Sequence, residues 1–150
     1  MPEYLETTVD KFIFRVATDR LYATDGVWAQ ETDEGGRVRA GLSDYLQQRA
    51  GDMAFVHAKP LGTKLAPGDT FAELETIKAN LDLYSPIQGA LIEVNKSLDL
   101  TPEIINQDPY GKGWVAMIEA DDWQADRAKL LTPQEYLSAM RAQAEEELNN

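Results

Sequence analysis

The residue with the clearest chemical potential is Lys78, which stands between two runs typical of β-strands, FAELETI and LDLY. Glu75 precedes it and Asp82 follows it, so an amine at an expected tight turn is flanked by two carboxylates. An unmodified lysine has an ordinary pKa of about 10.4 and is a poor nucleophile at neutral pH. Most turn lysines only add surface charge, and by periodicity alone Lys78 is such a residue.

Other reactive side chains are scarce. The chain contains no cysteine, which excludes a disulfide framework, a thiolate metal site and a catalytic thiol. Its single histidine, His57, excludes a metal site built from several histidines, and we expect no metal site. No spacing assembles a nucleophile, a base and an orienting group. The sequence therefore predicts a protein that is not itself an enzyme.

The charge restricts the class of partner. The formal net charge is −12, from 26 acidic and 14 basic side chains. This balance repels nucleic acid phosphates and anionic membranes, so we expect neither as a partner. No apolar run approaches the roughly 20 residues of a membrane span, and MPEYLETTVDKF lacks a basic region followed by an apolar stretch. These features predict a cytoplasmic protein.

The elements that must position Lys78 are mostly short strands. Alternating apolar residues predict strands at Phe12–Val16, Tyr22–Gln30, MAFVHA, FAELETI, LDLY, ALIEVN and WVAMIEA. Leu42, Tyr45, Leu46 and Arg49 have helical spacing; Ser43 or Asp44 can cap this helix, and Gly51 ends it. One helical turn is expected at Pro102–Asn106.

The chain ends in a predicted helix with a capping box. Thr132 is the expected cap, Pro133 the first helical residue and Glu135 the third position of the box.

The 150 residues predict a single domain with a real core. Many short strands separated by proline–glycine turns favour a mainly β fold, a small sandwich or flattened barrel with peripheral helices. We expect residues 1–20 to be an N-terminal extension and residues 138–150 to form a frayed helix end. Trp28, Trp114 and Trp123 are expected to be core or interface anchors, and Tyr110 to brace the loop beside the hairpin.

Two separated motifs resemble the lipoyl-carrying H proteins of the glycine cleavage system. The first is ETIKANLDLYSPIQGALIEVN, in which Glu75, Lys78, Asp82, Pro86 and Gly89 take the places of the family pattern. The second is TPEIINQDPYGKGW, Thr101 to Trp114. The resemblance covers residues 22–136. It implies a barrel-sandwich hybrid fold with a short internal helix and a C-terminal helix.

The resemblance also implies the cofactor. Lipoate would be attached to Lys78 through an amide, which removes the charge and makes a tether that extends on the order of a dozen Å. Biotin carriers have a similar hairpin, but their lysine lies between methionines, whereas Ile77 and Ala79 flank Lys78. Glu75 and Asp82 would help a lipoate–protein ligase or lipoyl transferase to recognise the hairpin, or would position the arm; solvated hairpin charge is the alternative for each.

Four polar positions of the cleft that would hold the loaded arm depart from the glycine cleavage pattern. The residues that would hold the aminomethyl ammonium, a serine, two histidines and a glutamate, are replaced here by Asp25, Gly26, Val27 and Tyr45. The hairpin also carries an apolar residue, Leu81, where a small polar one is common. This pattern resembles the H-like lipoate-binding proteins of heterodisulfide-reductase-like sulfur oxidation.

The main prediction is therefore a carrier of sulfur-bound intermediates. Its expected partners are a heterodisulfide-reductase-like complex and dihydrolipoamide dehydrogenase. The first alternative is a glycine cleavage H protein whose partners are glycine decarboxylase and aminomethyltransferase. The second is a lipoyl relay or scaffold protein. A carrier that visits several enzymes is most simply a monomer.

Overall fold

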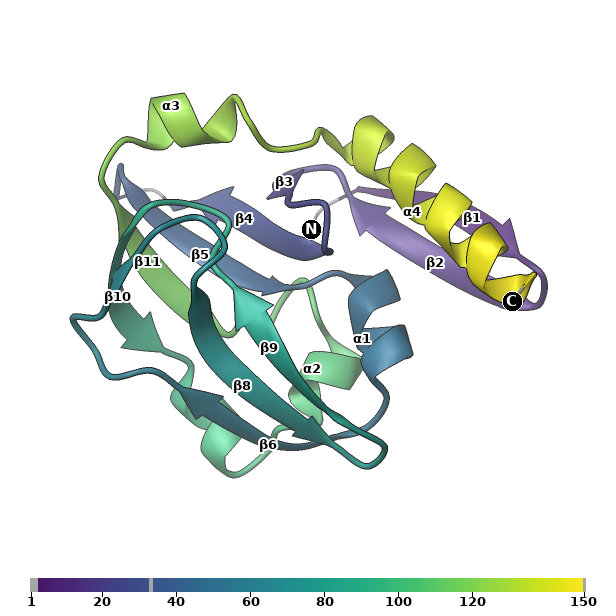
Figure 1. The fold of residues 1–150 in the computed structure, drawn as a ribbon, viewed down its shortest axis with the longest axis horizontal. Helices are drawn as coiled ribbons and strands as arrows, with labels where there is room; N and C mark the ends of the chain where they lie inside the picture. The colour runs from purple at the N-terminus through teal and green to yellow at the C-terminus, as the bar shows by residue number, and fades with distance from the viewer. Residues whose placement is uncertain (1–2, 33, 150) are drawn as a thin grey trace.

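The protein is described by a computed structural model that covers residues 3–32 and 34–149. Two β-sheets form a sandwich, and a separate two-stranded hairpin lies beside it with the last helix (Figure 1). The six-stranded sheet contains, in spatial order, β3 (Leu21–Tyr22), β4 (Val27–Glu31), β5 (Arg37–Leu42), β11 (Ala116–Ala120), β10 (Gly89–Val94) and β7 (Lys64–Leu65). The three-stranded sheet contains β6 (Met53–Ala58), β8 (Thr70–Thr76) and β9 (Asn80–Tyr84). The hairpin contains β1 (Tyr4–Val9) and β2 (Phe12–Ala17).

Short helices connect and flank the strands. They are α1 (Asp44–Ala50), the 3₁₀ helix η1 (Lys96–Asp99), α2 (Ile104–Gln107), α3 (Trp123–Arg127) and α4 (Pro133–Leu148). The predicted mainly β barrel-sandwich with an internal and a C-terminal helix is confirmed. None of the helices in the described ranges has the length and hydrophobicity needed to cross a bilayer.

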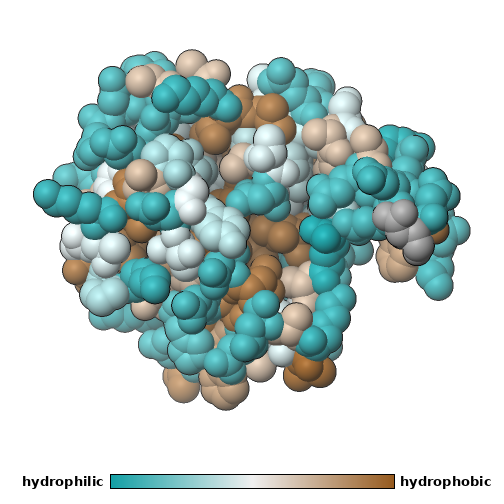
Figure 2. All heavy atoms as spheres, viewed as in Figure 1, coloured by the Kyte–Doolittle hydropathy of each residue, from teal (hydrophilic) through white to brown (hydrophobic). Residues whose placement is uncertain are grey.

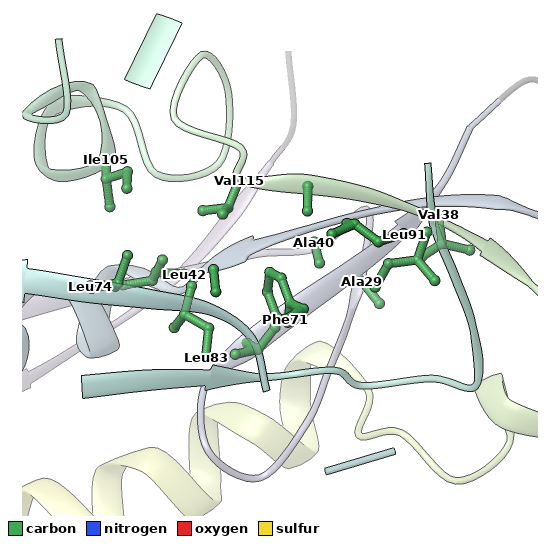
Figure 3. Packing of buried hydrophobic residues seen from close by; sticks show 14 of the residues in the cluster. Ala29, Val38, Ala40, Leu42, Phe71, Leu74, Leu83, Leu91, Ile105 and Val115 are labelled. Atoms are coloured by element: carbon green, nitrogen blue, oxygen red, sulfur yellow. The ribbon is translucent and has the colours of Figure 1, made fainter. Parts of the chain in front are cut away.

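The main core lies between the two sheets. Phe71, Leu74 and Leu83 of the three-stranded sheet face Ala29, Val38, Ala40 and Leu42 of the six-stranded sheet (Figure 3). All are almost fully buried. Burying a side chain of leucine or phenylalanine size contributes about 1.5–3 kcal/mol, so this layer fixes the strands that carry the β8–β9 turn.

A second cluster, mostly aromatic, attaches the N-terminal hairpin and α4 to the sandwich. The rings of Tyr22 and Tyr136 stack with centroids 4.5 Å apart and an interplanar angle of 6°. Phe14 of β2 meets Tyr45 of α1 edge to face at 5.1 Å. Residues 3–17 are therefore more than a loose extension, because Phe14 and Val16 are buried.

The prediction of one strand at Tyr22–Gln30 is wrong. These residues belong to two strands, β3 and β4, which pair antiparallel with Tyr22 opposite Trp28. Gly26 lies in the turn between them at φ +98°, a conformation that favours glycine, and its N–H donates to the Ala23 carbonyl. The strand β5 was missing from the prediction, because its residues run directly into the helical pattern of α1.

The C-terminal helix also differs from expectation. Its capping box is present as predicted: Thr132 Oγ1 accepts from the Glu135 N–H at 3.2 Å, and Glu135 Oε1 accepts from the Thr132 N–H at 2.9 Å. Helix α4 continues to Leu148 instead of fraying from residue 138. Met140 and Ala144 are buried in the second cluster, and that packing stabilises the later turns.

Candidate functional site

Lys78 lies in the tight turn between β8 and β9, at one end of the three-stranded sheet (Figure 1). The last cross-strand pair before the turn is Glu75 with Asn80. The turn is closed by Thr76, whose N–H and hydroxyl both donate to the Ala79 carbonyl, at 2.8 and 2.9 Å. A further bond joins the Ile77 N–H to the Asp52 carbonyl at 3.0 Å. The backbone that presents the lysine is therefore well ordered by its own hydrogen bonds.

The Lys78 side chain is exposed, and its hydrocarbon stem lies over Gly51. A Cβ placed on Gly51 would be 3.2 Å from Lys78 Cε, so the stem touches the backbone of the α1–β6 connection. Within residues 3–32 and 34–149, Nζ of Lys78 forms no ion pair and no hydrogen bond. A free amine on a supported stem fits covalent acylation, which needs an unpaired nitrogen with an open approach.

Asn106 of α2 fixes the backbone on which the stem rests. Its Nδ2 donates to the Gly51 carbonyl at 2.9 Å and to Gln47 Oε1 at 3.0 Å. Its Oδ1 accepts from the Met53 N–H at 3.0 Å. Asn106 lies in the second motif, and its sequence context predicts no role for it. No local pattern reveals these bonds, because they join α2 to residues more than fifty positions earlier.

Glu75 and Asp82 lie on the outer face of the three-stranded sheet, not against the amine. Glu75 is half-buried and its Oε1 lies 3.1 Å from His57 Nε2. Asp82 is exposed on β9, in the neighbouring row, opposite Glu73. In the part of the chain that the structure describes, neither carboxylate forms an ion pair or hydrogen bond with Lys78, so both are accessible to a partner that approaches the hairpin.

The second motif has a structural role. Tyr110 is buried; its hydroxyl donates to the Arg15 carbonyl at 2.6 Å and accepts from the Asp44 N–H at 3.1 Å. Tyr110 therefore braces β2 and the start of α1, whereas the sequence predicted that it would brace the loop beside the β8–β9 hairpin. Trp28 is buried and its indole N–H lies 3.0 Å from both the Leu42 and the Pro109 carbonyls. Trp123 is also buried, whereas Trp114 is only partly so.

Three of the four substituted positions, Gly26, Val27 and Tyr45, are buried and closely packed. Val27 is in the main core, and a Cβ on Gly26 would meet the Tyr136 hydroxyl at 2.9 Å and Ser43 Oγ at 3.0 Å. Tyr45 is buried beneath Phe14, and desolvation raises its pKa to about 12. Asp25 remains at the surface, where its Oδ1 accepts from the Val27 N–H, and partial desolvation raises its pKa.

Among the residues that the structure describes, no metal-binding cluster and no catalytic group of side chains lies beside Lys78. No cluster of three or more histidine, cysteine or acidic side chains in the described ranges could hold a metal ion. His57 contacts the Glu75 carboxylate, but it forms no hydrogen bond with a nucleophile among the described side chains.

Comparison with known proteins identifies the group to which the chain is similar. Residues 20–143 match the family model for the glycine cleavage H-protein. The glycine cleavage system H protein of Chlorobium limicola is 40% identical over 121 residues, 81% of this chain and 94% of the relative. That of Thermus thermophilus is 35% identical over 129 residues, 86% of this chain and 98% of the relative. The crystal structure of a glycine cleavage system H protein from Mycobacterium marinum superposes with a TM-score of 0.73 at 30% identity, covering 82% of this chain and 97% of that one.

These similarities overturn the main functional prediction. A sulfur-oxidation carrier with a heterodisulfide-reductase-like partner is contradicted, because the similar proteins are named as glycine cleavage H proteins. The prediction of a non-catalytic subunit is confirmed, as is the cofactor: members of this family carry lipoate covalently on a lysine. The chain belongs to the glycine cleavage H-protein family and is a lipoyl carrier without catalytic activity of its own.

Proposed function

We propose that this protein is the H protein of a glycine cleavage system, with lipoate attached to Nζ of Lys78. The observation that carries the proposal is the unpaired amine at an exposed, hydrogen-bonded turn, in a chain whose relatives bear that name. When bound, the dithiolane supplies two sulfurs that carry the aminomethyl group and pass on electrons.

The chain contributes the presentation of the arm. The hydrogen bonds of Thr76 and the bond from Ile77 to Asp52 keep the turn in one conformation. The uncharged backbone of Gly51 lies against the hydrocarbon stem of Lys78 and supports it. The attached arm is then tethered at a fixed point and remains free to enter another enzyme. We assign Glu75 and Asp82 to recognition of the hairpin by the attaching enzyme, because both lie on the outer face and neither forms an ion pair with a described lysine or arginine.

The partners follow from this role. A lipoate–protein ligase or lipoyl transferase acylates Lys78; glycine decarboxylase loads the arm, aminomethyltransferase unloads it, and dihydrolipoamide dehydrogenase reoxidises it. The cytoplasmic location, the monomeric state and the single carrier domain over residues 1–150 stay predictions from the sequence.

Two measurements test the proposal in order. Purified protein is incubated with a lipoate–protein ligase, lipoate and ATP, and its intact mass is recorded; we expect one lipoyl increment, and none in Lys78→Arg. The acylated protein is then added to glycine decarboxylase, and exchange of labelled bicarbonate into glycine is followed. Acylation of Lys78→Arg would contradict the attachment site, whereas an acylated wild type that does not stimulate exchange would contradict the glycine cleavage role.

A further inference from the structure

The outer face of the three-stranded sheet beside Lys78 combines an exposed aromatic ring with carboxylates. Antiparallel pairing sets two rows across β6, β8 and β9. The row nearer the turn holds Phe55, Glu75 and Asn80, and the next row holds His57, Glu73 and Asp82. We call these six residues the docking face. Side chains in adjacent strands of such rows lie about 4.5–5.5 Å apart at Cβ, so they form one continuous surface.

Phe55 is the apolar part of the docking face. It is 59% exposed, and its ring stacks on that of His57 with centroids 6.2 Å apart and an interplanar angle of 18°. His57 is in turn held by Glu75 at 3.1 Å. The aromatic ring is therefore held in place without being buried, and such a ring can enter a partner's pocket with little loss of side-chain entropy. In Figure 2 the surface over β8 and β9 mixes hydrophobic and hydrophilic residues.

The rest of the docking face is anionic. Glu73, Glu75 and Asp82 are all solvent-accessible, and among the ion pairs of the described residues only Glu75 takes part, with His57. Glu73 and Asp82 form no ion pair with any described residue, and such carboxylates suit a partner surface rich in lysine and arginine, which accelerates encounter and fixes orientation.

The reach of the unmodified lysine decides which enzyme this surface fits. From Cα to Nζ a lysine extends roughly 6 Å by bond-length arithmetic, whereas the finished arm extends about twice as far. An acylating active site must therefore come within one lysine length of the turn, and its rim must cover the adjacent row. Enzymes that act on the finished arm can bind further away.

We propose that the docking face is bound by the basic rim of the enzyme that acylates Lys78, with Phe55 inserted in an apolar pocket of that enzyme. This inference rests on the proposed attachment of lipoate to Lys78. It assigns a binding role to Phe55, His57 and Glu73, in addition to the two carboxylates of the hairpin.

Steady-state acylation of the full-length apo-protein by a lipoate–protein ligase, with lipoate and ATP, tests the assignment. For Phe55→Ala we expect kcat/KM to fall about 30-fold through KM, the lower limit for an interface hot spot. The matched control is Leu61→Ala: Leu61 is 63% exposed, between β6 and β7 and outside the docking face, and its variant should match the wild type. Both residues are exposed, so both variants should unfold at the wild-type temperature.

Glu73→Gln tests the charge separately. Its kcat/KM should fall several-fold at low salt and converge with the wild type at about 1 M salt, where screening acts over roughly 3 Å. The docking face is overturned if wild type is acylated and both Phe55→Ala and Glu73→Gln react like Leu61→Ala. A wild type that gains no lipoyl mass instead overturns the attachment at Lys78 and the docking face with it.

Discussion

At the scale of single residues, Gly51 explains how an exposed lysine is presented in a defined direction. Its backbone lies at φ +86° and ψ −167°, a region that is essentially restricted to glycine. The missing side chain leaves room for the Lys78 stem, whose Cε would be 3.2 Å from an added Cβ. One residue thus ends α1 and supports the Lys78 side chain.

We therefore expect Gly51→Ala to have two effects. Backbone strain should lower the free energy of unfolding by about 1–3 kcal/mol, and displacement of the lysine stem should reduce kcat/KM for acylation by roughly 3- to 10-fold. Chemical denaturation and the ligase assay measure the two effects. Gly62→Ala is the control: Gly62 also has a positive φ, +90°, but nothing lies within 4 Å of its added Cβ. If both variants lose acylation equally, the stem contact has no role.

The substituted residues show why the cargo could not be predicted from single positions. Gly26 and Val27 are set by packing, since the Tyr136 hydroxyl occupies the space above Gly26 and Val27 belongs to the core. Gly26 is therefore determined by the packing of α4, and Val27 by the packing of the main core. Their identity does not record which group the arm carries, so counting lost ammonium partners at these positions led to the wrong conclusion.

At the scale of elements, α4 depends on a capping box that titrates. Hydrogen bonds from the backbone and the hydroxyl of Thr132 lower the pKa of Glu135. A carboxyl whose pKa is lowered on folding stabilises the folded state above its unfolded pKa, and that contribution disappears as the pH falls through the folded value. The stabilisation is therefore present at neutral pH and lost in the acid range, below the ordinary glutamate value of 4.5.

The comparison of wild type with Glu135→Gln isolates this effect. Glutamine keeps an acceptor for the Thr132 N–H but does not ionise. The difference in unfolding free energy should favour wild type at pH 7 and shrink toward zero as the pH falls below about 4.5. Urea denaturation at a series of pH values measures it. A difference that does not change with pH would show that the charge of Glu135 does not contribute.

The elements also show how far the sequence determines the fold. The β8–β9 hairpin, the capping box of α4 and the cap of α1 at Ser43 depend on neighbouring residues, and all three were predictable. The bonds of Asn106 and the position of β5 between β4 and β11 depend on residues distant in sequence, and periodicity cannot reveal them. The position of the lysine was therefore predictable, but the groups that support it were not.

At the scale of the whole molecule, the hairpin of β1 and β2, which we call the clasp, lies on one side of the sandwich. The family match begins at residue 20, so β1 and β2 lie before it. They pack with α4 and α1 through the second cluster, whereas Lys78 lies at the end of the three-stranded sheet (Figure 1). A substitution in the clasp should therefore lower the stability of the protein without changing the acylation of Lys78.

Phe14→Ala tests this separation. Phe14 is 6% exposed and packs on Tyr45, so its loss should reduce the free energy of unfolding by about 3 kcal/mol. Its neighbour Ile13 is 56% exposed, and Ile13→Ala should change stability by less than about 0.5 kcal/mol. At a temperature where both variants are fully folded, each should be acylated with the wild-type kcat/KM, because neither change reaches the β8–β9 turn or Gly51. A specific loss of acylation in folded Phe14→Ala would mean that the clasp and the lysine turn are energetically coupled.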